Sequence, residues 1–71
     1  MNRWAVCLFN AETRASLEIR KLYEVLSDAE AEGMDFLRVI DESGEDYLYP
    51  RSLFGEVEIT EEISDALRRA S

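Results

Sequence analysis

Hydrophobic residues in this chain come in short runs separated by polar segments, a pattern typical of a small, mainly β domain. The stretch from Trp4 to Phe9 is continuously apolar, which favours a strand covered on both faces. The stretch from Phe36 to Ile40 places Leu37 and Val39 on one face, and Gly55 to Ile59 alternates as a half-buried last strand does. We expect all three stretches to be strands.

Between the second and third of these stretches lies a hairpin signal. Asp41 and Gly44 occupy positions i and i+3 of a type I turn, a common basis for short hairpin loops. The turn predicts that Phe36–Asp41 pairs with Asp46–Tyr49 in antiparallel fashion. Leu48 on the second strand is expected to be a core residue, as is the later Phe54.

Single residues mark the end of the hairpin and the start of the C-terminal helix. Pro50 cannot donate a ladder hydrogen bond, so the strand should end there and Arg51–Phe54 should form a tight or 3₁₀ turn. Thr60 is placed to cap a helix over residues 60–70, with acidic residues in its first turn and arginines in its last. An apolar stripe should pack this helix on the sheet, although a partner or dimer face is the alternative; its members are Ile63, Ala66, Leu67 and Ala70.

The segment from Leu17 to Leu26 fits two interpretations. Its apolar residues have the i, i+3, i+4, i+7 spacing of a helix face, yet alternation also allows a strand over Leu22–Ser27. After it, Asp28–Gly33 should form one helical turn that ends with Gly33 in a left-handed conformation.

Charge limits the partners of this chain. Eight basic residues stand against 16 acidic ones, a net charge of −8, and the excess is concentrated between Glu24 and Glu62. Such a surface repels phosphate, so direct binding to nucleic acid or to anionic lipid is not expected. A protein partner is expected instead, and basic partners would be attracted to the acidic surface.

Residue types limit the chemistry. Histidine is absent and Cys7 is the only cysteine, which excludes intramolecular disulfides, cysteine-based zinc sites and triads of the Ser-His-Asp kind. Cys7 is expected to be a small packed hydrophobe. With no evident cleft for paired carboxylates, we expect no enzymatic activity, no catalytic residue, no cofactor and no metal. No signal peptide or spanning segment is recognised, so a cytoplasmic protein is expected.

Five short strands with a proline turn between the last two resemble an SH3-like barrel. More narrowly, the chain resembles short, uncharacterised bacterial proteins that share a segment close to Val39-Ile40-Asp41-Glu42-Ser43-Gly44-Glu45-Asp46-Tyr47-Leu48-Tyr49-Pro50. The resemblance implies a single SH3-like domain over residues 1–71, with a five-stranded barrel over 3–59 and a short C-terminal helix. It also favours a strand at Leu22–Leu26, although Arg20 stands where the family pattern has glycine.

The resemblance and the aromatic residues together suggest a working surface. We expect an aromatic groove that binds extended, proline-rich ligands. The groove residues are Tyr23, Tyr47, Tyr49, Pro50 and Phe54. The alternative is that these side chains belong to the core. The acidic residues beside the groove are expected to bind a basic partner; they are Asp41, Glu42, Glu45 and Asp46. The predicted function is a small acidic protein-interaction module, and the alternative is an acidic, antitoxin-like regulator that blocks a basic nucleic-acid-binding surface.

Overall fold

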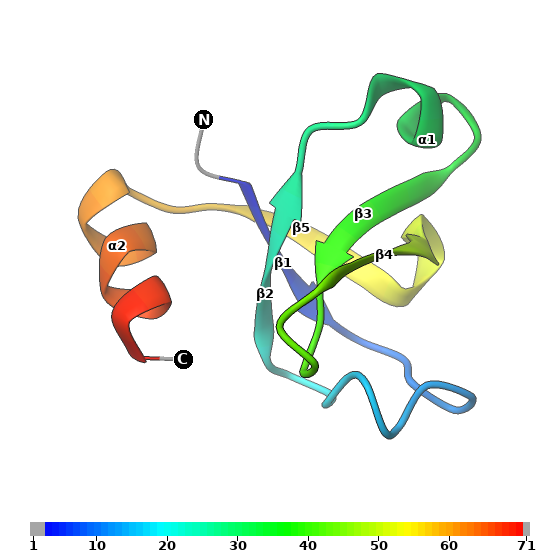
Figure 1. Ribbon diagram of the computed structural model, residues 1–71, viewed down its shortest axis with the longest axis horizontal. Coiled ribbons are helices and arrows are strands. Elements are labelled where there is room, and N and C mark those ends of the chain that lie inside the picture. The colour runs from blue at the N-terminus through cyan, green and yellow to red at the C-terminus, as the bar shows by residue number, and fades with distance from the viewer. Residues whose placement is uncertain (1–2, 71) are drawn as a thin grey trace.

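Five antiparallel strands form one sheet, with a short helix between the second and third strands and a longer helix at the C-terminal end (Figure 1). The computed structural model describes residues 3–70. The mainly β fold and the C-terminal helix are confirmed. The elements are β1 (Arg3–Cys7), β2 (Leu22–Leu26), α1 (Ala29–Gly33), β3 (Phe36–Ile40), β4 (Asp46–Pro50), the 3₁₀ turn η1 (Arg51–Leu53), β5 (Phe54–Glu58) and α2 (Glu61–Ala70).

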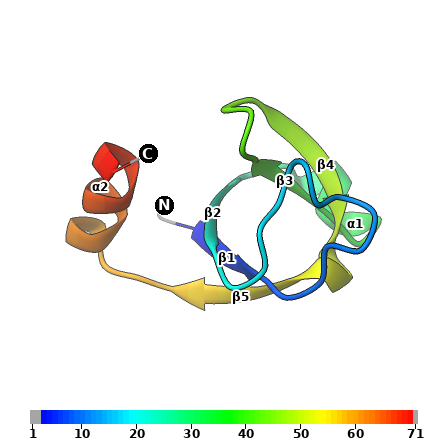
Figure 2. The same cartoon turned by 90° about the horizontal axis from the view of Figure 1, so that it is seen from below.

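The strand order in the sheet is β4-β3-β2-β1-β5, so the last strand returns to pair with the first. In register, Trp4 lies opposite Val57, and Val39 lies opposite Tyr47. Strands β4 and β5 are the two edges, and the sheet curves strongly between them (Figure 2). No pairing joins these edges among residues 3–70, so the expected closure into a barrel is not confirmed.

The concave face of the sheet carries the core. Alternate residues of each strand point to this face, as the pleat requires, and Leu37 and Val39 are fully buried as expected. Leu17 joins them from the loop after β1. The expectation that Leu48 is a core residue is wrong, because it lies on the opposite face and is 42% exposed. The buried cluster consists of Ala5, Cys7, Leu17, Tyr23, Val25, Leu37, Val39, Tyr49 and Phe54.

The turns are set by a few backbone conformations. Gly44 donates its N–H to the carbonyl of Asp41 at 2.9 Å and has a φ of +84°, which confirms the predicted hairpin. Gly33 does not have the expected left-handed conformation. Helix α1 runs through it, and Asp35 makes the reversal instead, with a φ of +64°. Asp tolerates this region better than most residues.

The ambiguous segment resolves as a strand. Residues Leu22–Leu26 form β2, and Tyr23 and Val25 point into the core as alternation predicts. Burial of both side chains between β1 and β3 outweighs the helical spacing, because propensity is worth only tenths of a kcal/mol per residue. Arg20, at the position where glycine was expected, has a φ of +72° and makes the turn that leads into β2.

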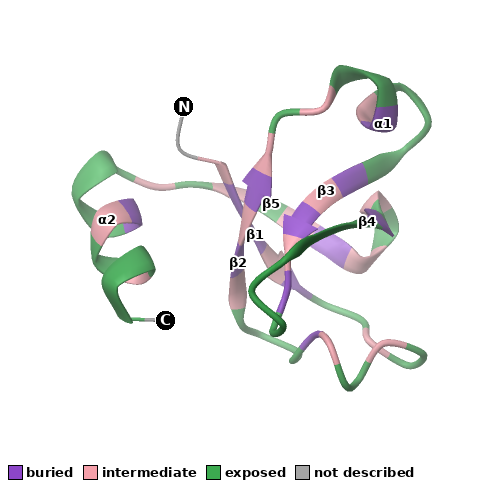
Figure 3. Ribbon diagram, viewed as in Figure 1, coloured by how far each residue is buried: buried purple, intermediate pink, exposed green. Residues whose placement is uncertain are grey.

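Helix α2 lies to one side of the sheet, beyond the end of β5 (Figures 1 and 3). Thr60 caps it, because its hydroxyl accepts the N–H of Ile63 at 3.1 Å. The stripe residue Ile63 remains 49% exposed, whereas Ser64 is fully buried and accepts the indole N–H of Trp4 at 2.8 Å. Ala66 and Ala70 are exposed as well and only Leu67 is half-buried, so the expectation that the whole stripe packs on the sheet is wrong.

Candidate functional site

The structure separates the five residues of the predicted aromatic groove. Tyr23, Tyr49 and Phe54 are buried, and the rings of Tyr49 and Phe54 meet edge to face with centroids 6.3 Å apart. Tyr47 is 49% exposed at one end of β4, and Pro50 is exposed at the other end. Of the five residues, two are therefore exposed on the described surface, and these two are not adjacent.

The predicted acidic cluster is largely engaged in contacts within the protein. Asp41 is buried and accepts the hydroxyl of Tyr49 at 2.6 Å. Glu42 accepts the hydroxyl of Tyr23 at 2.5 Å and pairs with the Lys21 ammonium at 2.7 Å. The bonds from Lys21 and Tyr23 hold the pKa of Glu42 below its usual range. Burial and the bond to Glu42 raise the pKa of Tyr23.

The other two acidic residues of the hairpin differ in availability. Asp46 pairs with Arg38 at 2.9 Å, and Arg38 also contacts Asp28 at 2.8 Å. Glu45 is exposed, and its carboxylate has no partner among residues 3–70. Of the four predicted acidic residues, only Glu45 therefore offers an unengaged charge to a partner.

An open pocket of about 650 Å³ lies beside η1 and includes two of the predicted site residues, Pro50 and Phe54. Exposed Met34 and Phe36 form its other wall, at the turn between α1 and β3, and Phe36 lies directly opposite Pro50 in the sheet. We call this surface the η1 pocket. It is lined by Met34, Asp35, Phe36, Pro50, Arg51, Ser52 and Phe54.

Backbone and side-chain contacts from Arg51 hold the two walls of the η1 pocket together. The N–H of Arg51 bonds to the carbonyl of Asp35 at 2.9 Å, and its Nη2 donates to the carbonyl of Glu32 at 3.2 Å. Its Nη1 pairs with Glu56 at 3.1 Å. The pocket is thus fixed by α1, η1 and β5 together, and the protein need not reorganise to present it.

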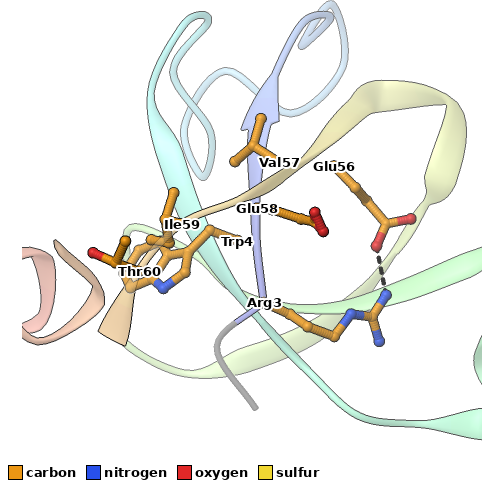
Figure 4. A pocket seen from close by; sticks show the side chains of 7 residues that line it. All are labelled: Arg3, Trp4, Glu56, Val57, Glu58, Ile59 and Thr60. Carbon is orange, nitrogen blue, oxygen red and sulfur yellow. Dashed lines mark hydrogen bonds and ion pairs between the residues drawn. The ribbon is translucent and has the colours of Figure 1, made fainter. Parts of the chain in front are cut away.

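A second open pocket, of about 580 Å³, lies along β5 near its junction with α2 (Figure 4). Trp4, Val57 and Ile59 give it apolar walls, while Glu56 and Glu58 supply carboxylates. We call it the β5 pocket, and its lining is completed by Arg3 and Thr60. Because the chain has no histidine, neither pocket can pair a hydroxyl nucleophile with that base.

Searches for clustered metal ligands, for membrane-spanning helices and for similar known proteins all gave no match in the described chain. Within residues 3–70 no three potential metal-ligating side chains of the His, Cys, Asp or Glu type gather in one place. Neither described helix has the length and apolar content to cross a bilayer. No protein-family model, curated protein or solved structure matches this chain significantly.

Sequence reasoning missed Met34 and Phe36 in the η1 pocket. Met34 follows the predicted helical turn Asp28–Gly33 and belongs to no periodic pattern of apolar residues. Phe36 was predicted only as the first residue of a strand. The sequence contains no signal for Met34, because single apolar residues are common at protein surfaces and its exposure is seen only in the structure.

Proposed function

We propose that this protein is a small protein-interaction module of the SH3-like class, which binds an extended segment of a partner at the η1 pocket. The observation that carries the proposal is the set of exposed apolar side chains, Met34, Phe36 and Pro50, grouped over buried Phe54. The class is supported by a fifth strand that returns to the first and by the 3₁₀ turn between the last two strands.

The η1 pocket is suited to a partner segment that has a proline or another apolar residue next to a lysine or arginine. Apolar walls with few polar groups are typical of sites that hold extended, proline-rich segments. At the rim, the side chain of Asp35 is 93% exposed, and it pairs only loosely with the Nε of Arg51, at 3.9 Å. Because Arg51 is engaged with Glu56 and Glu32, Asp35 remains able to pair with a basic residue of the partner.

Selection of binding peptides from a random library tests this proposal even though the partner is unidentified. The wild-type protein should enrich peptides that contain proline or aromatic residues near a lysine or arginine. Met34→Ser should weaken binding of the selected peptides by about tenfold, the equivalent of about 1.4 kcal/mol, because the truncated side chain no longer covers the ligand. Titration calorimetry with the purified variants measures this difference.

Ile63→Ser is the matched control, because it removes a similarly exposed apolar side chain from α2, away from the η1 pocket. It should bind the selected peptides like the wild type. The proposal is wrong if selection enriches no motif, or if Met34→Ser and Ile63→Ser bind equally well. Tyr49→Ala is not a suitable probe, since Tyr49 is a core residue.

A further inference from the structure

The outer edge of β5 is open, and the hydrogen-bonding pattern shows which residues face it. Cys7 donates its N–H to Lys21 at 3.0 Å and accepts the N–H of Arg20 at 2.7 Å, so its backbone groups face the β2 side. Backbone groups of successive strand residues point to opposite sides. Those of Trp4 and Val6 therefore face β5.

The register extends this alternation to β5. Trp4 lies opposite Val57, so the backbone groups of Val57 point toward β1. Those of its neighbours Glu56 and Glu58 then point away from the sheet. Figure 2 shows β5 along the rim, with no other segment of the described chain beyond it. An edge of this kind is a template for an added strand.

Within the part of the chain that the structure describes, the carboxylate of Glu58 has no partner at this edge. Arg3 is its directly opposed residue, yet the Arg3 guanidinium bonds to Glu32 at 2.6 Å and to Glu56 at 2.5 Å. No other group within residues 3–70 bonds to the Glu58 side chain. In Figure 4 the Glu58 side chain carries no dashed contact, whereas Glu56 is joined to Arg3.

The opposite face of β5 is apolar. Val57 and Ile59 are half-buried there, next to the Trp4 indole, and line the β5 pocket. One face of the open edge thus presents a carboxylate that no described residue pairs with, and the other presents aliphatic side chains with room beside them. A strand that adds to this edge meets both faces, because its own side chains alternate.

We propose that β5 binds an extended partner segment in which basic and aliphatic residues alternate, with a basic residue beside Glu58 and aliphatic residues beside Val57 and Ile59. Opposite charges and apolar pairs across strands both stabilise a sheet. A second copy of this chain does not fit, since antiparallel pairing of two β5 edges would bring glutamates together. The site is separate from the η1 pocket and does not rest on the function proposed for it.

Binding of a defined probe tests this inference on the full chain. The probe is a capped peptide with three lysines and two valines in alternation, and its control has the same residues in two blocks. In ¹⁵N-¹H spectra the alternating peptide should shift the amides of 56–59 and the Trp4 indole, and the block peptide should bind at least about tenfold more weakly.

Two variants with equal change in charge separate local recognition from general attraction. Glu58→Lys should lower the affinity for the alternating peptide by about tenfold or more, while Glu45→Lys, at the exposed hairpin tip, should leave it nearly unchanged. Glu58→Gln, which keeps the shape of the side chain, should give an intermediate loss. Met34→Ser should bind this peptide normally, which distinguishes failure here from failure of the η1 pocket.

N-methylation of the peptide tests strand addition itself. Methyl groups on the alternate amides that face β5 should abolish binding, and methyl groups on the other set should not. The inference is overturned if both methylated peptides bind alike, if the block peptide binds as tightly, or if Glu58→Lys and Glu45→Lys lose affinity equally.

Discussion

Asp41 has its predicted place in the hairpin turn and also a contact with the core that its neighbours in the sequence did not predict. Its carboxylate accepts the N–H of Ser43 at 2.8 Å, the hydroxyl of Ser43 at 2.6 Å and the buried hydroxyl of Tyr49 at 2.6 Å. Burial opposes ionisation of Asp41, but the bonds from Ser43 and Tyr49 outweigh it and hold its pKa below the usual range. One side chain thereby joins the hairpin turn to the core.

Removing the Tyr49 hydroxyl should therefore destabilise the protein. Tyr49→Phe leaves the buried carboxylate of Asp41 without one donor, and a hydrogen bond to a charged group contributes about 1.5–3 kcal/mol. Urea unfolding at pH 7 should show a loss in this range. Tyr47→Phe is the control, because Tyr47 is exposed. The free energy of unfolding of this variant should differ from the wild type by less than about 0.5 kcal/mol. Equal losses in the two variants would contradict the role given to the Asp41–Tyr49 bond.

Among the elements, the hairpin was predictable because its signals are local. Asp41 and Gly44 specify the turn within four residues, and Pro50 marks where the strand gives way to η1. The segment before β2 was ambiguous because its outcome depends on distant contacts. Tyr23 and Val25 are buried because β1 and β3 pair with β2 on its two sides. The hydrophobic periodicity of the segment does not show that these strands are its neighbours.

The candidate site was only partly predictable for a similar reason. Tyr47 and Tyr49 share a strand face by alternation, yet only Tyr49 lies over Phe54 and becomes buried. The η1 pocket forms because the Arg51 N–H bonds to the Asp35 carbonyl, which brings two separate turns together. Sequence patterns describe each turn alone, so they indicated Pro50 and Phe54 but not the facing wall.

The contact between Ser64 of α2 and Trp4 of β1 leads to a prediction about how α2 is held in place. Trp4 lies on the outer face of the sheet, and a buried indole N–H needs an acceptor, which explains why Ser64 rather than the apolar stripe faces it. Ser64→Ala should leave that donor unsatisfied, at a cost of about 1–3 kcal/mol. Arg68 of α2 also bonds to Glu24 of β2 through Nε at 3.1 Å and Nη2 at 2.6 Å, a contact that the substitution leaves in place. The loss should therefore appear as local opening of the helix.

Hydrogen exchange and fluorescence can detect this opening. In Ser64→Ala, amides of residues 61–70 should exchange faster while those of β2 and β3 stay protected, and emission from Trp4 should shift to longer wavelength as water reaches the ring. Ser52→Ala, in exposed η1, should change neither signal. Unchanged exchange in α2 of Ser64→Ala would show that other contacts hold the helix.

Across the molecule, the acidic excess coexists with a connected set of ion pairs. Arg3 pairs with Glu32 and Glu56, and Arg51 pairs with Glu56, so two arginines connect α1, β1, η1 and β5. These pairs are largely at the surface, where each contributes little by itself. Their main consequence is that they hold two pocket-lining side chains in place, because Arg51 lines the η1 pocket and Arg3 lines the β5 pocket.

The same engagement of carboxylates predicts how stability depends on pH. Hydrogen bonds and cationic neighbours lower the pKa of several carboxyl groups in the folded state, namely Asp28, Glu32, Asp41 and Glu42. In the unfolded chain these groups titrate at their ordinary values, about 3.9 for Asp and about 4.3 for Glu. On acidification the unfolded state therefore binds protons first, and the contribution to stability is lost.

We expect the free energy of unfolding contributed by these groups to be fully present above about pH 5 and to fall steadily as the pH is lowered through the folded-state pKa values. Urea denaturation at several pH values measures this dependence. Glu42→Gln should be less stable than the wild type at pH 7 and should lose less on acidification, because its bonds to Lys21 and Tyr23 no longer involve a carboxylate charge.

Glu45→Gln is the control for this pH dependence, because it removes an exposed carboxylate from the same hairpin without touching Lys21 or Tyr23. Its stability should follow the wild-type curve at every pH, since the Glu45 carboxylate has no bonded partner among residues 3–70 that the substitution could remove. Identical curves for Glu42→Gln and Glu45→Gln would show that the Lys21–Glu42–Tyr23 contacts do not contribute to the acid sensitivity of the fold.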